Sequence, residues 1–418
     1  SSKGRKSAAD PRVLFKVLIH GYLCGIYSSR KLEEACQYRI DFRWLLEDRK
    51  APDHSTLARF RTGRCREAVE DLFYQFVRKL EEAGETNHKA VFIDGTKLES
   101  RAGRYTFVWR KSVEKQLTKV KERLKLLTRL TTSAAVRSLL EEAAKGIEFV
   151  SGKGKRKSQA QRDWEEKQSL LERWERYEAM LSTMGEGRGS YSKTDPDATF
   201  MRLKEDHMRN GQLKPAYNVQ IAVNSEYLTG LEVFSDRTDV KTLRPMLNML
   251  SRRHQARYEE VVADAGYESL ENYLYLEQNG QLCFIKPTNY DQKKTKKFRK
   301  QVGRIENMKY APEEDSFTCA QGRKLHLRRE ATEVRDGQLV STAWYRCENC
   351  SGCPHRAQCC RAKAPDKPKE IILKKTFWEK REQATRNIMT ERGIQLRLCR
   401  PIQVEGTFGL LKNDFGFR

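Results

Sequence analysis

Three acidic residues stand in sequence patterns that could gather divalent cations. Asp94 ends the apolar stretch VFID, Asp264 ends the stretch VVAD, and a glycine follows each within two residues. Both patterns predict a buried strand that delivers an aspartate to its C-terminal end, where open sheets usually place chemistry. Glu405 lies in a predicted helix near the C-terminus, in the sequence PIQVEGTF. Together these carboxylates offer the oxygen ligands that hard divalent cations prefer.

Each acidic residue also has a simpler interpretation. An aspartate after a strand often does no more than start a turn. Three other glutamates, Glu379, Glu382 and Glu391, also lie on helical stretches before the C-terminus. Glu405 is favoured because Lys412 follows seven residues later, which places it on the same face of an α-helix. A lysine there could contact a DNA phosphate beside the cations.

Several helices are predicted before the first of these strands. Helix starts are predicted at Pro11, after Ser28 and after Asp53. Short helices joined by tight turns would suit a helix-turn-helix-like DNA-binding unit. The cations that such a unit would present to DNA are Arg59, Arg61 and Arg64. A plain helical bundle with a solvated basic face is an equally good interpretation.

The remaining elements suggest how Asp94 and Asp264 could meet. After the Asp94 strand, a helical hairpin is predicted over about residues 108–184, broken by the basic loop GKGKRK, which lacks the spacing of a phosphate-binding loop. The later predicted elements are strands at 215–223 and 227–234, a helix at 239–254, the Asp264 strand, a helix at 269–278 and a strand at 282–286. With the insertions set aside, this is the order of the ribonuclease H-like fold, whose first and fourth strands lie side by side. We therefore expect an α/β core of that type.

The chain is strongly basic, with 81 Lys plus Arg against 57 Asp plus Glu and a net charge of +24 over 418 residues. A polyanionic partner is the simplest explanation. A membrane explains it less well, because no stretch approaches about 18 consecutive apolar residues and no signal-peptide core stands at the start. A dense basic run at residues 293–300 could contact a phosphate backbone or form a solvated loop, and the two interpretations are equally supported.

Six of the eleven cysteines crowd into one short region. They are Cys319, Cys347, Cys350, Cys353, Cys359 and Cys360. In a large chain without a secretory signal, such clustering favours a metal over disulfides. Two CxxC steps in series suit a tetrahedral structural zinc site, and a reduced thiol cluster without metal is the alternative.

Taken together, these stretches resemble the DDE transposases of bacterial insertion sequences, in the branch with a cysteine-rich insertion before the last acidic residue. The resemblance covers nearly the whole chain. It is carried by DPRVLFKVLIHGYLCGIYSSRKLEEA, PDHSTLARFR, VFIDGTKLES, HMRNGQLKPAYNVQIAV, VVADAGYESLENYLYL, the cysteine cluster and IQVEGTFGLLKNDFGFR. It implies that Asp94, Asp264 and Glu405 form a metal-binding triad, with Asp94 as the shared ligand. It also implies that the N-terminal helices help to recognise terminal inverted repeats.

For the cysteine cluster, the resemblance favours Cys319, Cys350, Cys353 and Cys359 as zinc ligands, with Cys347 as the main rival and His355 as a weaker one. The chain departs from related transposases in having no tyrosine shortly before Glu405, where Arg397 and Arg400 stand instead. Family members also usually continue with more helix after this glutamate than the present sequence does.

The chemistry that such a triad serves is in-line displacement at phosphorus, in strand cleavage and in joining a 3′-hydroxyl to new DNA. Two Mg²⁺ or Mn²⁺ ions roughly 4 Å apart can activate the attacking oxygen and stabilise the leaving one. Three carboxylates are enough when water and a DNA phosphate complete the shell.

We therefore expect a metal-dependent transposase of the bacterial cytoplasm that acts on double-stranded DNA, both terminal inverted repeats and target. A homodimer in a synaptic complex is expected, with no membrane partner. The alternative is a catalytically inactive or truncated transposase-derived DNA-binding protein. A zinc-ribbon RNA-binding protein is disfavoured, because the sequence shows no array of stacking aromatic residues in a basic sheet.

Five segments are predicted. They are a helical N-terminal DNA-binding domain at 1–86, a ribonuclease H-like core at 87–107 and 195–290, a helical insertion at 108–194, a basic and cysteine-rich insertion at 291–385, and a C-terminal core helix carrying the glutamate at 386–418.

Overall fold

The structure is a computed structural model that describes residues 10–47, 49–103, 105–152, 156–203, 211–335, 337–360 and 367–416. The stretch HMRN at 207–210 and the centre of the GKGKRK loop lie outside these residues. The chain divides into two compact units, one of residues 1–95, 220–232 and 239–418 and the other of residues 96–219 and 233–238. None of the described helices has both the length and the apolar composition needed to cross a membrane.

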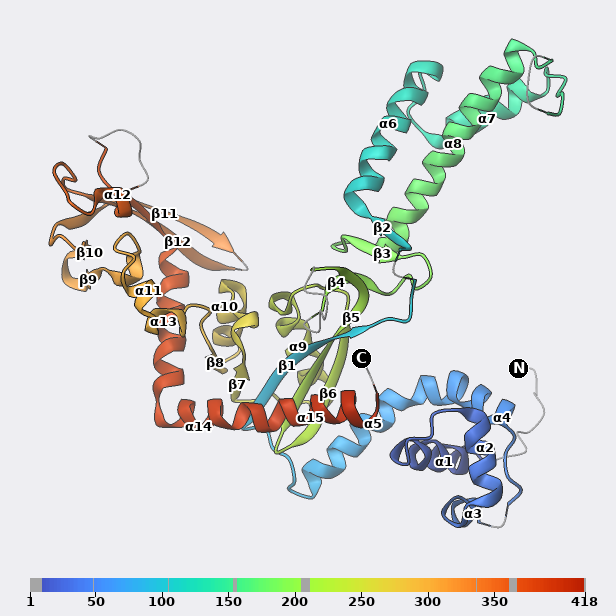
Figure 1. Cartoon of the computed structure of the whole chain (residues 1–418), viewed down its shortest axis with the longest axis horizontal. Coiled ribbons are helices and arrows are strands. Elements are labelled where there is room, and N and C mark those ends of the chain that lie inside the picture. Colours follow the sequence, from blue (N-terminus) through green and yellow to red (C-terminus); the bar gives the residue numbers. More distant parts are fainter. Residues whose placement is uncertain are drawn as a thin grey trace. The chain divides into compact units, whose positions relative to one another are not determined.

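The first unit begins with helices joined by short connections (Figure 1). They are α1 (Pro11–Leu23), α2 (Ser29–Tyr38), α3 (Ile40–Leu46), α4 (His54–Phe60) and α5 (Arg66–Glu82). The predicted starts of α1 and α4 are confirmed, because the Asp10 and Asp53 side chains accept hydrogen bonds from the first turns of these helices. The sequence did not predict α3, whose Phe42 and Leu46 are buried in a core shared with α1, α2 and α4. A kink at Gly63 separates α4 from α5.

The structure contains a six-stranded mixed sheet. Its strands are β1 (Ala90–Glu99), β4 (Thr199–Arg202), β5 (Leu213–Asn224), β6 (Tyr227–Phe234), β7 (Glu260–Ala263) and β8 (Leu282–Ile285). Their order is β4-β5-β1-β7-β8, with β6 also paired to β5. β1 and β7 run parallel, as do β7 and β8, whereas β4 and β5 are antiparallel. The predicted adjacency of the first and fourth core strands is confirmed, and the mixed α/β architecture is consistent with a ribonuclease H-like core.

Helices of the first unit pack around this sheet. They are α9 (Leu243–His254), α10 (Leu270–Gln278), α13 (Lys375–Met389), α14 (Glu391–Arg400) and the short α15 (Gly406–Gly409). Figure 1 shows α13 and α14 meeting at a sharp corner, where Gly393 approaches the Asn387 carbonyl so closely that a Cβ would lie 2.1 Å from that oxygen. One hydrophobic core joins Phe92 and Val262 of the sheet to Ile388 of α13 and Leu396 of α14.

The cysteine-rich part of the first unit forms a second sheet, which the sequence did not predict. Its strands are β9 (Lys309–Ala311), β10 (Ser316–Thr318), β11 (Lys324–Arg335), β12 (Gln338–Cys347) and β13 (Glu370–Leu373), in the antiparallel order β13-β12-β11-β10-β9. Two short helices, α11 (Lys296–Arg299) and α12 (Arg356–Cys359), accompany it. Asp315 accepts hydrogen bonds from the Tyr310 and Tyr345 hydroxyls and pairs with Lys375, which connects this sheet to the start of α13.

The second unit contains three helices, α6 (Arg110–Thr128), α7 (Ser133–Ala144) and α8 (Gln159–Met184). Their shared core includes Leu124, Val136 and Trp174. The helical segment predicted from residue 108 is wrong at its start, because residues 107–109 form β2 (Phe107–Trp109), which pairs with β3 (Ser190–Ser192). Aromatic and β-branched residues favour that strand pairing over a helical turn.

Candidate active site

The pairing of β1 with β7 brings Asp94 and Asp264 to the same edge of the sheet. The register places Ile93 opposite Ala263, so that the next residue of each chain segment is an aspartate. Asp94 is buried, with 9% of its surface exposed, and one of its carboxylate oxygens accepts a hydrogen bond from the Gly95 N–H. Asp264 turns the chain after β7, and its carboxylate accepts a hydrogen bond of 2.7 Å from the Gly266 N–H.

The guanidinium group of Arg400 faces both aspartates. Its Nη2 lies 3.1 Å from Asp94 Oδ2 and 3.8 Å from Asp264 Oδ2. Arg400 ends α14, and the side chains of Arg400 and Asp94 are only 18% and 12% exposed. Two carboxylates held this close to one another repel unless a cation lies between them. The structure therefore holds a positive charge at the point where the sequence predicted divalent ions.

A third aspartate, Asp239, lies beside this pair and was not singled out in the sequence. Gln220 of β5 donates a hydrogen bond of 3.0 Å to Asp239 Oδ1 and accepts one from the Tyr267 hydroxyl. A Cβ added at Gly266 would lie 2.9 Å from Asp264 Oδ1 and 3.4 Å from Asp239 Oδ2, so both carboxylates border the same glycine. The only sequence signal for Asp239 was its place at the start of a predicted helix.

The Tyr267 hydroxyl is buried beside these carboxylates, and its pKa responds to their charge. Burial raises the pKa of Tyr267 well above its ordinary value, and the carboxylates of Asp94, Asp239 and Asp264 raise it further, whereas Arg400 lowers it. Tyr267 therefore stays protonated and serves as a hydrogen-bond donor. All three carboxylates (the acidic cluster) therefore lie near enough to this buried phenol to disfavour its ionisation.

Glu405 lies on the same chain segment as Arg400 but on a different face. Leu396, Arg400 and Val404 recur at intervals of four residues, and Leu396 and Val404 are buried in the core against the sheet. Glu405 follows in a π-helical turn, Pro401–Glu405, and is exposed. Within the described residues its carboxylate makes no hydrogen bond or ion pair. The structure thus brings Asp94 and Asp264 together. Glu405 follows Val404 directly, but its side chain lies outside the helix face that packs against the sheet.

A cleft of about 470 Å³ opens beside Asp264, between the ends of β7 and β8 and the helix α14. Its polar lining is mainly basic, with Lys286, Arg397 and Arg400 beside the single carboxylate of Asp264. Arg397 donates a hydrogen bond of 3.3 Å to the Tyr290 hydroxyl, which holds its guanidinium in place. Such a lining suits a phosphate group next to the acidic cluster.

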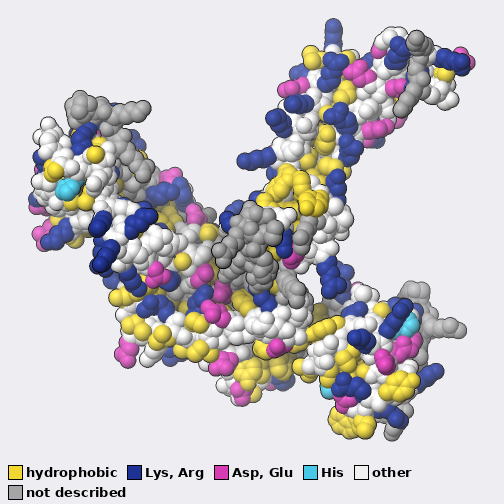
Figure 2. Space-filling view, in the orientation of Figure 1, with side chains coloured by type: hydrophobic (Ala, Val, Ile, Leu, Met, Phe, Trp, Pro, Cys, Tyr) yellow, Lys and Arg dark blue, Asp and Glu magenta, His cyan; other side chains and the backbone are white. Residues whose placement is uncertain are grey.

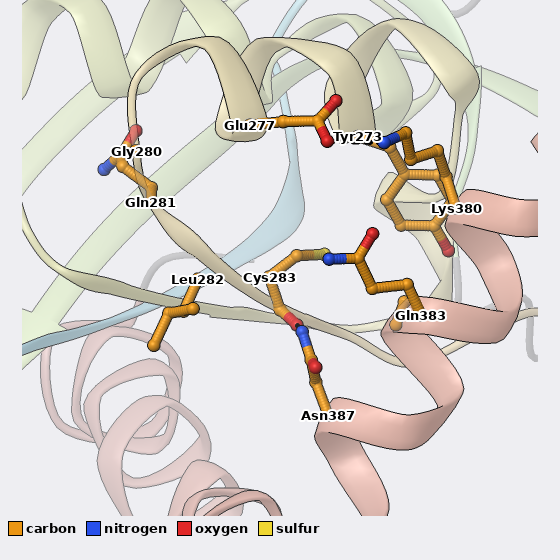
Figure 3. A pocket seen from close by; sticks show the side chains of 10 residues that line it. Tyr273, Glu277, Gly280, Gln281, Leu282, Cys283, Lys380, Gln383 and Asn387 are labelled. Carbon is orange, nitrogen blue, oxygen red and sulfur yellow. Dashed lines mark hydrogen bonds and ion pairs between the residues drawn. The ribbon is translucent and has the colours of Figure 1, made fainter.

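Another pocket, of about 250 Å³, lies between α10, β8 and α13 (Figure 3). Three of its polar side chains already bond to protein groups: Lys380 pairs with Glu277 at 2.5 Å, and Asn387 donates to the Cys283 carbonyl at 3.0 Å. These contacts fasten α13 to the core, and the pocket contains none of the acidic cluster.

The cysteines gather around a cavity of about 20 Å³. Cys319, Cys350, Cys353 and Cys359 line it together with Cys347 and Cys360. Burial raises the pKa of Cys359, and the neighbouring thiols of Cys350, Cys319 and Cys353 raise it further. The Cys347 and Cys360 sulfurs instead lie near the Asn349 and Lys367 carbonyls. Within the described residues no three of these sulfurs lie within 4.8 Å of one another, so a tetrahedral zinc ion here stays a prediction.

The predicted DNA-contacting cations differ in their surroundings. Arg61 donates to the Tyr27 carbonyl and to the Ser29 hydroxyl, so its guanidinium fixes the start of α2. Arg59 and Arg64 are exposed, and the one hydrogen bond of the Arg59 side chain within the described part of the chain goes to the Ser55 carbonyl of its own helix. Lys412 is half-buried in a second π-helical turn, Leu410–Asp414. The two π-helical turns change the helical phase, so the α-helical spacing predicted between Glu405 and Lys412 does not apply.

Comparison with known protein families finds matches at both ends of the chain. Residues 1–63 match a family described as "Transposase domain (DUF772)", and residues 318–418 match one described as "Transposase DDE domain". Glu405 lies within the second match, whereas Asp94 and Asp264 precede it. No curated protein and no solved structure matches the chain.

Proposed function

Because the chain carries an N-terminal transposase domain and a transposase DDE domain, both of which imply transposition, we propose that it is an active DDE transposase. It cleaves DNA at the ends of an insertion sequence and joins the freed 3′-hydroxyl ends to target DNA. The observation that carries this proposal is the pair of strand-end aspartates, Asp94 and Asp264, sharing one cation, Arg400.

The acidic cluster fits divalent ions such as Mg²⁺ or Mn²⁺, since its donors are carboxylate oxygens at the mouth of a basic cleft. When bound, such ions supply activation of the attacking oxygen and stabilisation of the leaving oxygen. Asp94 and Asp264 are the residues that would hold them, and Arg400 would have to release both carboxylates. Lys286 and Arg397 would then orient the DNA phosphate in the cleft.

Two residues are candidates for the third carboxylate. Glu405 is the residue that the family resemblance implies, and it would approach the aspartates only if its helix turned about its axis. Asp239 already borders Asp264 across Gly266. DNA cleavage by Asp239→Asn and Glu405→Gln variants distinguishes the two candidates. Loss of a metal ligand abolishes cleavage, whereas loss of a nearby carboxylate that does not bind the metal only slows it. We expect Glu405→Gln to be inactive, and cleavage by it at the wild-type rate would assign the role to Asp239.

DNA binding is proposed for the basic surfaces outside the cluster. Arg59 and Arg64 are exposed on the N-terminal helices, and the helical hairpin carries Lys and Arg side chains along its length (Figure 2). Both are suited to phosphate contacts. A second copy of the chain would be needed to hold two element ends in one synaptic complex.

The experiment that tests the proposal is cleavage of a supercoiled plasmid carrying the DNA that flanks the gene on both sides, in the presence of Mg²⁺. Asp94→Ala and Asp264→Ala should abolish cleavage while DNA binding persists, and Asp163→Asn, on the exposed side of α8, serves as the control. Cleavage by either active-site variant would contradict the proposal. Binding without any cleavage by the wild-type protein would favour the alternative, an inactive transposase-derived DNA-binding protein.

A further inference from the structure

A group of metal-binding side chains lies away from the acidic cluster, at the junction of α5, β1 and α9. Glu81 comes from the end of α5, His88 from the segment that leads into β1, and His254 from the end of α9. One ligand atom from each of these residues lies within 4.8 Å of the others. The His254 side chain is 1% exposed and the Glu81 side chain 20% exposed. Tyr258 packs against both imidazole rings, and the His88 side chain is 31% exposed.

The hydrogen bonds of His254 determine where its lone pair points. Nε2 lies 3.0 Å from the Thr229 carbonyl oxygen. A carbonyl only accepts, so Nε2 must carry the proton. In the neutral ring Nδ1 then bears a lone pair, yet it lies 2.7 Å from Glu81 Oε1, an atom that is also an acceptor. Two acceptors this close together require a positive charge between them, which is either a second proton on the ring or a metal ion.

The third member of the group decides between these two possibilities. His88 Nε2 is buried and has no hydrogen-bond partner among the described residues, although it lies 3.4 Å from Glu81 Oε1. A proton between Glu81 and His254 would leave this nitrogen with only the long contact to Glu81 Oε1. A metal ion would satisfy all three ligands. The bond from His254 to the Thr229 carbonyl is also the outer-shell contact that metal-bound histidines usually make.

The two distances to Glu81 are compatible with a metal ion after a small adjustment. Zinc–nitrogen bonds of 2.0–2.1 Å in tetrahedral geometry separate neighbouring ligand atoms by about 3.3 Å. The distance between His88 Nε2 and Glu81 Oε1 is 3.4 Å, close to that value, whereas the contact between His254 Nδ1 and Glu81 Oε1 at 2.7 Å would have to open by about 0.6 Å.

We propose that Glu81, His88 and His254 bind a first-row transition-metal dication such as Zn²⁺. Two imidazoles and one carboxylate suit zinc, iron or cobalt better than magnesium. The ion would tie the end of α5 to α9 and to the start of the strand that carries Asp94. Its role is structural, and it is independent of both the acidic cluster and the cysteines.

The test is Co²⁺ titration of the full-length chain after metal removal. Cobalt bound by thiolates absorbs strongly through sulfur-to-metal charge transfer, and cobalt bound by imidazole and carboxylate does not, so the spectrum separates this site from the cysteines. Wild-type protein should bind one equivalent of cobalt without thiolate absorption. In Glu81→Gln and His88→Gln that equivalent should bind at least about 10-fold more weakly, the lower limit seen when only outer-shell partners are removed.

His326→Gln is the matched control, because His326 pairs with Glu348 at 2.7 Å on the surface without a third ligand. Circular dichroism checks that each variant is folded, and in Glu81→Gln the new amide can still donate to His254 Nδ1. X-ray absorption of zinc-loaded wild-type protein provides a measurement without any substitution, and nitrogen or oxygen neighbours are expected. A zinc shell of sulfur alone, or equal cobalt binding by all four proteins, would overturn the proposal.

Discussion

Arg400 determines the state of the Asp94–Asp264 pair. Its guanidinium group is largely buried and touches both carboxylates. A divalent ion can enter between these carboxylates only by displacing the guanidinium, so the affinity for the ion is reduced by the strength of the existing ion pairs. Removing one member of a buried ion pair leaves an uncompensated charge, at a cost of about 3–5 kcal/mol.

Arg400→Gln should therefore destabilise the metal-free protein, by roughly 3 kcal/mol because the pair is partly exposed. It should also increase the rise in melting temperature that Mg²⁺ produces, since the ion no longer competes with a guanidinium. Thermal denaturation with and without Mg²⁺ measures both effects. Arg397→Gln is the control, because Arg397 lines the same cleft but bonds to Tyr290. An equal response to Mg²⁺ in the two variants would contradict the prediction.

Gly95 is required by the close approach of Gln220. A Cβ at position 95 would lie 2.1 Å from Gln220 Nε2, so Gly95→Ala must push the amide away from Asp239 and Tyr267. Overpacking of this kind costs about 1–3 kcal/mol. Urea denaturation should show that loss in Gly95→Ala and no loss in Gly409→Ala, a helical position with nothing within 4 Å of an added Cβ. Equal stability of the two variants would show that the site can adjust.

At the scale of single residues, Asp94 and Asp264 were predictable because the signal is local: an apolar strand, a carboxylate and a glycine. Asp239 and Arg400 were not, because their positions beside the pair depend on contacts between segments far apart in the chain. Arg400 faces inward only because Leu396 and Val404, four residues to either side, are buried against the sheet. A sequence pattern gives the spacing of such residues and not the direction in which the face points.

At the scale of elements, Glu268 fastens α13 to the core. Its side chain is 1% exposed and accepts hydrogen bonds from Arg381 at 2.7 and 3.0 Å and from the backbone and hydroxyl of Thr288. Burial acts to raise the pKa of Glu268, but Arg381 and Thr288 outweigh it and hold that pKa below its ordinary value. The contribution of Glu268 to stability is therefore complete at neutral pH and is lost as the pH falls through the folded-state pKa.

Glu268→Gln should lower the free energy of unfolding at pH 7 by about 2 kcal/mol or more, because it leaves the Arg381 charge without its partner. The difference from wild type should shrink as the pH falls through the lowered pKa of wild-type Glu268, where its carboxylate becomes protonated. Urea denaturation across this pH range measures it. Glu271→Gln is the control, because Glu271 is exposed and reaches Arg335 only at 3.9 Å. A stability difference that does not change with pH would contradict the predicted link between the protonation of Glu268 and the stability of the fold.

The helix α6 presents a stripe of exposed lysines, Lys111, Lys115 and Lys119, at intervals of four residues. Within the described residues none of them has a carboxylate partner. If they contact DNA phosphates, changing all three to Glu should reduce the slope of log affinity against log salt by roughly 2.7. Lys145→Glu, directly after α7, should leave the slope unchanged, because Lys145 already pairs with Glu142. Fluorescence anisotropy at several salt concentrations measures the slope. An unaltered slope in the triple variant would show that these three lysines do not contact DNA phosphates.

Elements were predictable where their sequence period is regular. The hairpin of β5 and β6 and the helices α9 and α10 follow clear alternation or helical spacing, and the structure confirms them. The strands β9 to β13 were missed because they are short or largely exposed: β11 buries only Leu325 of its 12 residues. Its register comes instead from pairing with β12, a contact that no local pattern encodes.

At the scale of the whole molecule, the zinc ion predicted at the cysteines would stabilise only part of the structure. Cys350→Ser should remove one equivalent of zinc and increase hydrogen exchange in strands β9 to β13, while α1 to α4 stay protected. Cys360→Ser is the control, because the Cys360 sulfur lies near the Lys367 carbonyl. Elemental analysis combined with hydrogen-exchange mass spectrometry measures both effects. Less than half an equivalent lost in Cys350→Ser would argue against a zinc ion at the cysteines.

The parallel pairing of β1 with β7 also governs when the protein can first act on DNA. Asp94 and Asp264 are 170 residues apart, and Arg400 follows much later. At typical translation speeds, roughly 10–30 s pass between the synthesis of the two aspartates. A chain released early therefore carries the basic helices without the Asp94–Asp264 pair that we propose as the cleavage centre. Prematurely terminated products could occupy DNA ends and compete with the complete protein, but they could not cut.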